Sequence, residues 1–329
     1  MSKRKAEQSS SSPQSPTPPS DNVVKRARLL PPLLDVARHE ETLYFGAAPL
    51  DCLFHLSLFL EPWPGFVHNP RALRYHSTLP GIRPRAMCFD REGHLTVALS
   101  GKNEVSVYDV GSGALLRKIG EGQHTFPSGC AVDFNGKIYV SEYAESLIKV
   151  FSASGALERQ FVVTCPRGLA LSADGRLLYA CTHPFDVKMF RARDGLDMGG
   201  IKVLLTSTND VAICSAQRIA ISHQQDTSGA VTTVHNSGYE IRTFGEYQVT
   251  KLARLAVDPY DNIYVANNAK NEVLVFSVEG QPITVLKSKG TDAEGKQMDF
   301  HDPCCIAISQ DGLIAISDFD GVALCSAVE

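Results

Sequence analysis

The hydrophobic positions of this chain recur in short alternating segments. Six segments share an apolar–small–apolar triplet, a tight turn, a second strand, a loop and a third strand. The triplets lie at 87–89, 130–132, 169–171, 211–213, 255–257 and 306–308, and their central residue is Ala five times and Cys once. Because strand side chains alternate between the two faces of a sheet, each triplet presents two large groups on one face and a small one on the other. We expect small residues where inner strands crowd around an axis.

The residue after each triplet marks a regular unit. These residues are Asp90, Asp133, Ser172, Cys214, Asp258 and Ser309, which are 43, 39, 42, 44 and 51 positions apart. Units of about 40–45 residues with four short strands have the size of a propeller blade. Four first turns contain glycine, which supplies the positive φ of a tight hairpin, whereas the fifth has Asp261-Asn262 and the fourth Ala216-Gln217. The sequence predicts an all-β fold, a six-bladed β-propeller.

The pattern also predicts how the ring closes. Third strands are expected at 105–108, 148–151, 187–190, 231–234, 273–276 and 322–325, and fourth strands at positions such as 115–119 and 240–244. The sixth segment stops after its third strand, while 73–77, before the first segment, is similar to the fourth strands. We expect 73–77 to pair beside 322–325, which would remove the exposed edges.

The chain resembles NHL-repeat propellers. The resemblance rests on 126–133 (FPSGCAVD), 138–142 (IYVSE), 148–151 (IKVF) and 255–277, and it covers roughly residues 73–329. It implies a propeller similar to that of tripartite-motif NHL proteins, which present loop surfaces to proteins or to single-stranded RNA. The nine cysteines include no C-x-x-C pair, so we expect neither a RING nor a B-box.

The N-terminal part differs from the rest in composition. The net charge is −4, but residues 1–30 carry six basic and two acidic side chains (+4), which leaves −8 for the remainder. Residues 1–28 are rich in Ser and Pro, so we expect a disordered tail. Its two basic clusters are candidate nuclear-import signals, with a solvated charged tail as the alternative. They consist of Lys3, Arg4, Lys5, Lys25, Arg26 and Arg28.

Residues 29–66 form a linker element whose structure the pattern leaves open, and 67–329 form the expected propeller domain. The stretch 48–60 has a short similarity to an F-box, which would make the protein a ubiquitin-ligase substrate adaptor. No run of roughly 20 apolar residues and no apolar signal region occurs. With widely spread cysteines, this composition predicts an intracellular protein, nuclear or cytoplasmic, that is monomeric and does not bind membranes.

One candidate site lies on the loops that lead into the first strands and on those that join second to third strands. Its cations are Arg85, Lys102, Arg167, Arg254 and Lys270. Together they would form a basic face that contacts phosphates of single-stranded RNA. Glu104, Glu142, Asp186 and Glu272 lie near them in sequence, and no aromatic stacking ladder is evident in these loops. Solvated surface charge is the alternative interpretation.

A second candidate site is formed by the residues that end the second strands. These are Leu99, Glu142, Thr182, His223, Asn267 and Asp318, which we expect at the mouth of the central channel. Glu142, His223, Asn267 and Asp318 are potential ligands of a divalent cation, as in a metal-dependent lactonase or related hydrolase. We expect no cofactor unless this alternative holds. Cys88, Cys130, Cys214 and Cys305 are interpreted as small core residues, and His124 and His301 as hydrogen-bonding loop residues.

No nucleophile elbow, phosphate-binding glycine loop or His-Glu-x-x-His motif occurs, so no catalytic residue is assigned. The favoured function is a non-enzymatic scaffold that presents propeller loops to a protein or peptide partner. RNA binding, the hydrolase and the ubiquitin-ligase adaptor are the alternatives.

Overall fold

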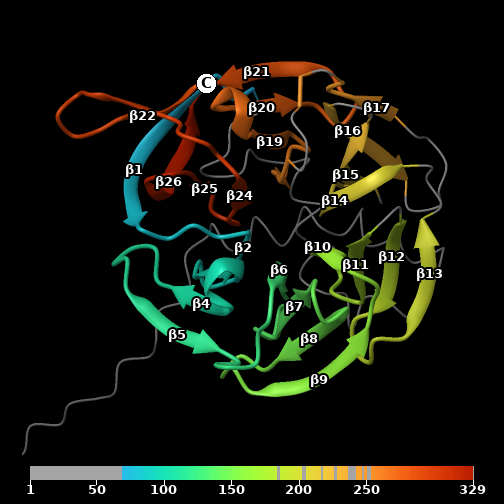
Figure 1. Ribbon diagram of the computed structural model, residues 1–329. Coiled ribbons are helices and arrows are strands. Elements are labelled where there is room, and N and C mark those ends of the chain that lie inside the picture. Colours follow the sequence, from blue (N-terminus) through green and yellow to red (C-terminus); the bar gives the residue numbers. More distant parts are fainter. Residues whose placement is uncertain are drawn as a thin grey trace, which may run out of the picture. The chain divides into compact units, whose positions relative to one another are not determined.

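The computed structural model describes residues 69–328 except 184–185, 202–204, 216–217, 226–227, 236–241, 247 and 250–252. The candidate nuclear-import residues and the F-box-like stretch lie outside the described residues. Within the described part, six four-stranded antiparallel sheets surround a common axis, as Figure 1 shows. The predicted all-β six-bladed propeller is therefore confirmed.

Blades 1 to 5 run outward from the axis in chain order, and in blade 6 the outermost strand is the first of the chain. Blade 1 contains β2 (Ala86–Phe89), β3 (Leu95–Leu99), β4 (Glu104–Tyr108) and β5 (Leu115–Ile119). Blade 2 contains β6 (Pro127–Val132), β7 (Ile138–Glu142), β8 (Leu147–Phe151) and β9 (Leu157–Val162). Blade 3 contains β10 (Pro166–Leu171), β11 (Leu177–Thr182), β12 (Asp186–Arg191) and β13 (Asp197–Ile201).

The other three blades repeat this order. Blade 4 contains β14 (Thr206–Ile213), β15 (Arg218–Gln225), β16 (Ser228–His235) and β17 (Arg242–Phe244). Blade 5 contains β18 (Leu255–Val257), β19 (Ile263–Asn267), β20 (Glu272–Phe276) and β21 (Pro282–Leu286). Blade 6 combines β24 (Cys305–Ile308), β25 (Leu313–Ser317) and β26 (Gly321–Val328) with β1 (Ala72–Pro80). All six predicted triplets lie in innermost strands.

The triplets determine how neighbouring blades pack. Ala131 of blade 2 lies in one apolar cluster with Leu169 and Leu171 of blade 3. The flanking Cys130 and Val132 lie in the cluster that faces blade 1. The same relation recurs at all six interfaces. The small side chain of each triplet therefore faces the two large side chains of the next blade's triplet. From the sequence alone, small residues are expected only because inner strands lie close together around the axis.

The turns between first and second strands follow the predicted chemistry. Gly93, Gly136, Gly175 and Gly312 have φ values of 82°, 74°, 66° and 85°. In blade 5 this left-handed position is taken by Asp261 (φ 61°). Asp261 also supplies a side-chain acceptor to the first turn of blade 4: its Oδ1 accepts a hydrogen bond of 2.7 Å from the Ser215 N–H. Cys214, which stands where other blades have Asp or Ser, offers no such oxygen acceptor.

Ring closure depends on two segments from opposite ends of the domain. β1 pairs antiparallel with β26 from Ala72–Val328 to Pro80–Gly321, with Tyr75 opposite Cys325. The strand expected at 73–77 is thus present, although longer. A hairpin of β22 (Ser288–Thr291) and β23 (Gln297–Asp299) precedes blade 6, and β22 packs on β1 and β26. None of the helices among the described residues has the length and apolar character needed to cross a membrane.

Candidate functional site: the upper face and the mouth of the central cavity

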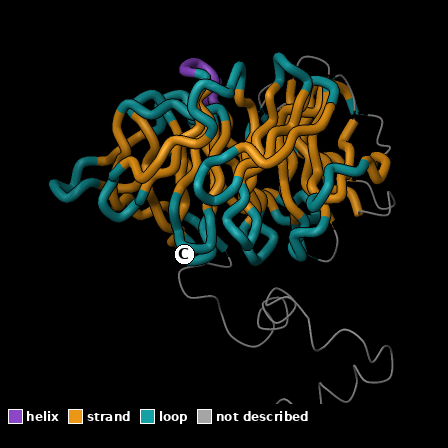
Figure 2. The backbone as a smooth tube through the Cα atoms, turned by 90° about the horizontal axis from the view of Figure 1, so that it is seen from below, coloured by secondary structure: helices purple, strands orange, loops and turns teal. Residues whose placement is uncertain are grey.

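The candidate residues gather on one side of the ring, which we call the upper face. It consists of the loops that lead into the first strands and the loops that join second to third strands. Two of the latter contain the short 3-10 helices η1 (Ser100–Lys102) and η2 (Asn268–Lys270). Figure 2 shows helix (purple) at the upper edge of the ring, with loops on both of its sides. The glycine turns described above lie on the opposite side.

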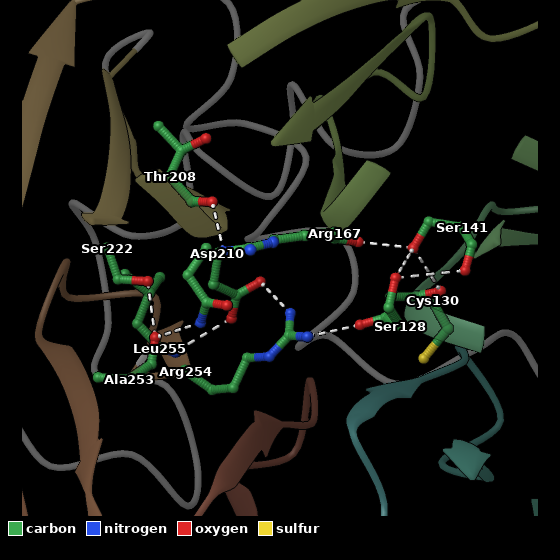
Figure 3. Close-up of polar contacts among 12 residues, drawn as sticks. Ser128, Cys130, Ser141, Arg167, Thr208, Asp210, Ser222, Ala253, Arg254 and Leu255 are labelled. Atoms are coloured by element: carbon green, nitrogen blue, oxygen red, sulfur yellow. Dashed lines mark hydrogen bonds and ion pairs between the residues drawn. The ribbon is translucent and has the colours of Figure 1, made fainter. Parts of the chain in front are cut away.

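An arginine bridges the upper end of the channel. Arg254 of blade 5 places Nη1 3.0 Å from Asp210 Oδ1 of blade 4, and its Nη2 donates to the Ser128 carbonyl oxygen of blade 2 at 2.5 Å (Figure 3). Blades 2 and 5 lie opposite one another, so this side chain spans the channel. The second Asp210 oxygen accepts a 3.1 Å hydrogen bond from the Leu255 N–H. Burial opposes the charge on Arg254, but neighbouring groups led by Asp210 raise its pKa.

Two glycines make room for this arrangement. A Cβ on Gly168 would lie 2.1 Å from Asp210 Oδ1, and a Cβ on Gly129 would lie 2.1 Å from the Arg167 carbonyl oxygen. Neither distance is sterically possible without displacement of the neighbour. These glycines occupy the position just before the triplet in blades 3 and 2, where blades 4 and 5 carry Asp210 and Arg254. Gly168 thus accommodates Asp210 of the next blade, and Gly129 accommodates the backbone of blade 3.

Below the bridge lies a central cavity of about 290 Å³. Residues of all six innermost strands line it, together with Asp210 and Arg254. Cys88 and Cys130, from adjacent blades, lie on this lining with their sulfur atoms 3.3 Å apart. The four cysteines interpreted as core residues do belong to, or pack against, the apolar clusters between blades.

The five predicted basic residues fall into two groups. Arg85, Lys102 and Lys270 are exposed and Arg167 is half-buried, all on the upper face. Arg254, at 4% exposure, is instead buried in the ion pair with Asp210. It is therefore a bridging residue and not a surface cation. The sequence pattern missed this because the partner Asp210 precedes it by 44 positions, on another blade.

The carboxylates near these cations are largely occupied by internal contacts. Glu142 is fully buried and accepts hydrogen bonds from the Thr125 and Phe126 N–H groups, both at 3.0 Å. Glu104 pairs with Lys118 at 2.7 Å. Glu272 accepts from the Asn267 amide at 2.7 Å. Among the described residues, no carboxylate lies within ion-pair distance of Arg85, Arg167, Lys102 or Lys270.

The residues that end the second strands do not line the central cavity. They lie one strand farther out, and the four candidate ligands among them have partners of their own. Glu142 Oε1 lies 2.5 Å from His124 Nδ1, and His124 Nε2 contacts the Ile119 carbonyl oxygen at 2.8 Å. His223 Nε2 lies 2.8 Å from Thr232 Oγ1.

The other two candidate metal ligands are engaged in the same way. The Asn267 amide donates to the Gln248 carbonyl oxygen at 2.9 Å and to Glu272 Oε1 at 2.7 Å. Asp318 pairs with Lys289 at 2.5 Å. His124 and His301 both form hydrogen bonds from their loops, as expected; His301 Nδ1 lies 3.2 Å from Asp320 Oδ2.

This donor set does not fit a shared cation. Glu142, His223, Asn267 and Asp318 belong to four different blades, and the positively charged Arg254 occupies the upper end of the channel between them. Among the described residues, the group of potential ligands that does converge is Asp90, Glu92 and His94 in the first turn of blade 1. Asp90 Oδ1 already accepts from the Glu92 and His94 N–H groups, so this cluster acts as a turn cap.

Aromatic residues on the upper face are the feature that sequence reasoning missed. Phe319 is 65% exposed, and the Arg83 guanidinium lies 3.8 Å from its ring centroid. On blade 2, exposed Phe126 lies 6.1 Å from Tyr143, whose ring has the Arg167 guanidinium at 5.6 Å. These residues are far apart in the sequence and share no motif, so only the ring assembles them.

Comparisons with known proteins identify the fold alone. No protein-family model matches the chain, and no curated protein matches it. Among solved structures, a streptogramin B lyase is similar with a TM-score of 0.57 and 10% identity, over 78% of this chain and 97% of that one. A Kuenenia stuttgartiensis hydrazine synthase is similar with a TM-score of 0.54 and 11% identity, over 78% of this chain and 98% of that one. At such identities no activity transfers to this chain.

Proposed function

We propose that this protein is an interaction module whose upper face binds a protein or peptide partner. The observation that carries the proposal is the exposed Phe319 ring beneath the Arg83 guanidinium, 3.8 Å from its centroid. The Arg83 Nε also donates to the Phe319 carbonyl oxygen at 3.3 Å, so the stack is held in place before a partner arrives. Aromatic and arginine side chains supply most of the binding energy at protein interfaces, and preorganisation lowers the entropic cost.

The resemblance to NHL-repeat propellers agrees with this role. A propeller is a rigid ring on which loop residues can vary, so recognition resides in the loops. On the upper face the second aromatic group, Phe126 with Tyr143, lies next to Arg167. A partner that covers both groups would bury aromatic surface while its acidic side chains meet the surrounding arginines. The potential acid-base groups at the ends of the second strands, in contrast, form hydrogen bonds and ion pairs with other residues of this chain.

Site-specific photocross-linking tests the proposal directly. p-Benzoylphenylalanine placed at position 319 of the full chain keeps an aromatic ring there; the same residue at position 162, where Val162 is 78% exposed on outer strand β9, is the control. In cell extract we expect the probe at position 319 to form protein cross-links that resist RNase. The probe at position 162 should give none of these products. Identical products from both positions, or none from 319, would refute the proposal.

The purified partner then allows a quantitative test. Phe319→Ala and Arg83→Ala should each weaken its affinity at least tenfold, since truncation of an interface hot spot costs about 2 kcal/mol or more. Val162→Ala should leave the affinity unchanged. Circular dichroism of each variant checks that the ring remains folded.

Single-stranded RNA is a second candidate because the structure supplies the stacking rings that the sequence did not reveal. Phe126, Tyr143 and Phe319 share the upper face with Lys102 and Lys270, and bases stack on such rings at about 1–3 kcal/mol each. Cross-links from position 319 that are lost on RNase treatment would favour this candidate over a protein partner.

A further inference from the structure

Three arginines lie at the upper ends of innermost strands, around the mouth of the central cavity, and the blade repeat places them there. Arg85 and Arg167 occupy the same position in blades 1 and 3, two residues before the triplet, and Arg254 precedes the triplet of blade 5 by one residue. The upper ends of all innermost strands meet around one opening. Figure 3 shows Arg167 and Arg254 on either side of Asp210.

The charges at this mouth do not balance. Asp210 neutralises Arg254, from which it lies 3.0 Å away. Among the described residues, the acceptors of Arg167 Nη1 are neutral: the Ser207 hydroxyl and the Thr208 carbonyl oxygen, both at 3.4 Å. Arg85 has no carboxylate within ion-pair distance among the described residues. Within the described part of the chain, these two guanidinium groups therefore have no carboxylate as a counter-charge at the cavity mouth.

Both burial and the neighbouring arginines act on Arg85. Partial burial, followed by the charges of Arg254 and Arg167, lowers the pKa of Arg85. An anionic group held between Arg85 and Arg167 would remove this repulsion and gain charge-assisted hydrogen bonds from both guanidinium groups. The site thus has both an electrostatic need for an anion and donors to bind it.

Building on the proposed function, we propose that the cavity mouth binds a single carboxylate of the peptide partner, with Arg85 and Arg167 as the donors. The carboxylate is a chain terminus or an Asp or Glu side chain. Planar guanidinium forks match a planar carboxylate. Arg85 and Arg167 lie around a single opening, whereas binding of an RNA backbone requires cations along a groove. Lys102 and Lys270, in η1 and η2, lie on separate loops and do not extend such a groove from the mouth.

Small probes test the mouth without the partner. The full chain is titrated with N-acetylglycine, which carries a peptide carboxylate, and with uncharged N-acetylglycinamide, at constant ionic strength. Inorganic phosphate forms a third arm. A ligand that binds only the folded state raises the thermal midpoint, here by roughly 2–4 °C when its concentration is well above its dissociation constant. We expect this shift with N-acetylglycine and not with the amide.

Variants locate the effect. Arg85→Gln and Arg167→Gln should abolish the ligand-induced shift, whereas Lys102→Gln, which removes an exposed cation elsewhere on the upper face, should retain it. The ligand-induced difference is compared within each variant, so changes in basal stability do not interfere. Three outcomes would overturn the proposal. They are no shift in the wild type, a shift that persists in Arg85→Gln, and a larger shift with phosphate than with N-acetylglycine.

The outcomes also separate this inference from the proposed function. Cross-links from position 319 without an N-acetylglycine shift would refute the carboxylate site and leave the interaction face intact. A shift that depends on Arg85 without cross-links from 319 would refute the interaction face and leave the carboxylate site intact.

Discussion

Arg254 and Asp210, on adjacent blades, form a buried ion pair 3.0 Å long that closes the upper end of the channel. Arg254 also reaches the Ser128 carbonyl oxygen on the opposite blade. One side chain thus links three blades. Because this contact crosses the ring, it stabilises the closed arrangement of blades and not a single sheet.

Arg254→Gln should destabilise the fold by about 3–5 kcal/mol, because it leaves the buried Asp210 carboxyl without its ion-pair partner. Asp210→Asn should have a similar effect. The double variant should cost clearly less than the sum of the two, since neither charge is then left alone. Urea unfolding gives these values. Arg191→Gln, which breaks an exposed 2.6 Å pair with Asp194, is the control and should barely change the midpoint. Strict additivity at Arg254 and Asp210 would contradict the coupling.

Gly168→Ala should destabilise the protein by roughly 1–3 kcal/mol or more, the usual cost of overpacking. The new Cβ would lie 2.1 Å from Asp210 Oδ1 and 2.6 Å from its Cα, so Asp210 must move away from Arg254. Gly101→Ala is the matched control, because a Cβ there has no atom within 4 Å. The two variants are compared by chemical denaturation. Equal midpoints would show that the mouth can expand without cost.

Lys289→Met should weaken ring closure. Lys289 is 1% exposed and lies 2.5 Å from buried Asp318 and 3.2 Å from Asp320. Burial opposes its charge, but the two aspartates raise the pKa of Lys289. Its removal leaves Asp318 without its ion-pair partner in a buried site, which should lower the free energy of unfolding by about 3–5 kcal/mol.

Hydrogen exchange locates this effect. Amides of β1 and β26, on which β22 packs, should exchange faster in Lys289→Met than in the wild type. Lys296→Met, at an exposed position of the same hairpin, should not change the exchange. Uniform acceleration over all blades would instead indicate global destabilisation without a role in closure.

Asp258 should make stability depend on pH. Burial raises its pKa to about 6 from the usual 3.8, even though the Tyr260 and Asn262 N–H groups donate to it. The folded state therefore holds a proton that the unfolded state loses near pH 4, so this group's contribution is fully present below pH 4 and is lost as pH rises to 6. Asp258→Asn should remove this dependence.

The loss of stability between pH 4 and 6 should be large enough to measure. A shift of about 2 pKa units corresponds to about 3 kcal/mol, by which the wild type should lose stability relative to Asp258→Asn between pH 4 and 6. Urea unfolding at several pH values measures the difference. Asp133→Asn, at the equivalent and more exposed turn of blade 2, controls for loss of the turn acceptor. A difference between wild type and Asp258→Asn that is constant with pH would refute the burial argument.

The local features of the blades were predictable because they depend on neighbours in sequence. Alternation of large and small residues in 130–132 and its counterparts is a property of one strand, and Gly136 reports the backbone conformation of one turn. Even Asp261, in the glycine position of its turn, was found to within one residue. Because these local signals recur six times, the fold could be predicted from the sequence.

The candidate site was predictable only in part. Arg85, Arg167, Lys102 and Lys270 were assigned to the correct face from their loops. Whether a charged residue is free or neutralised depends on a partner from another blade, as with Arg254 and Asp210. The internal contacts of Glu142 likewise come from the loop before its blade, and the ion pair of Asp318 comes from Lys289 in β22.

The sequence by itself determined a ring of six similar blades, because strand, turn and packing preferences act over a few residues and recur along this chain. Only the tertiary structure decided what the ring presents at its axis. It brought Phe319 under Arg83, buried Arg254 across the channel and, among the described residues, placed no carboxylate at ion-pair distance from Arg85 or Arg167. Closure sets the distances between blades, and Coulomb and stacking interactions depend on those distances and not on separation along the chain.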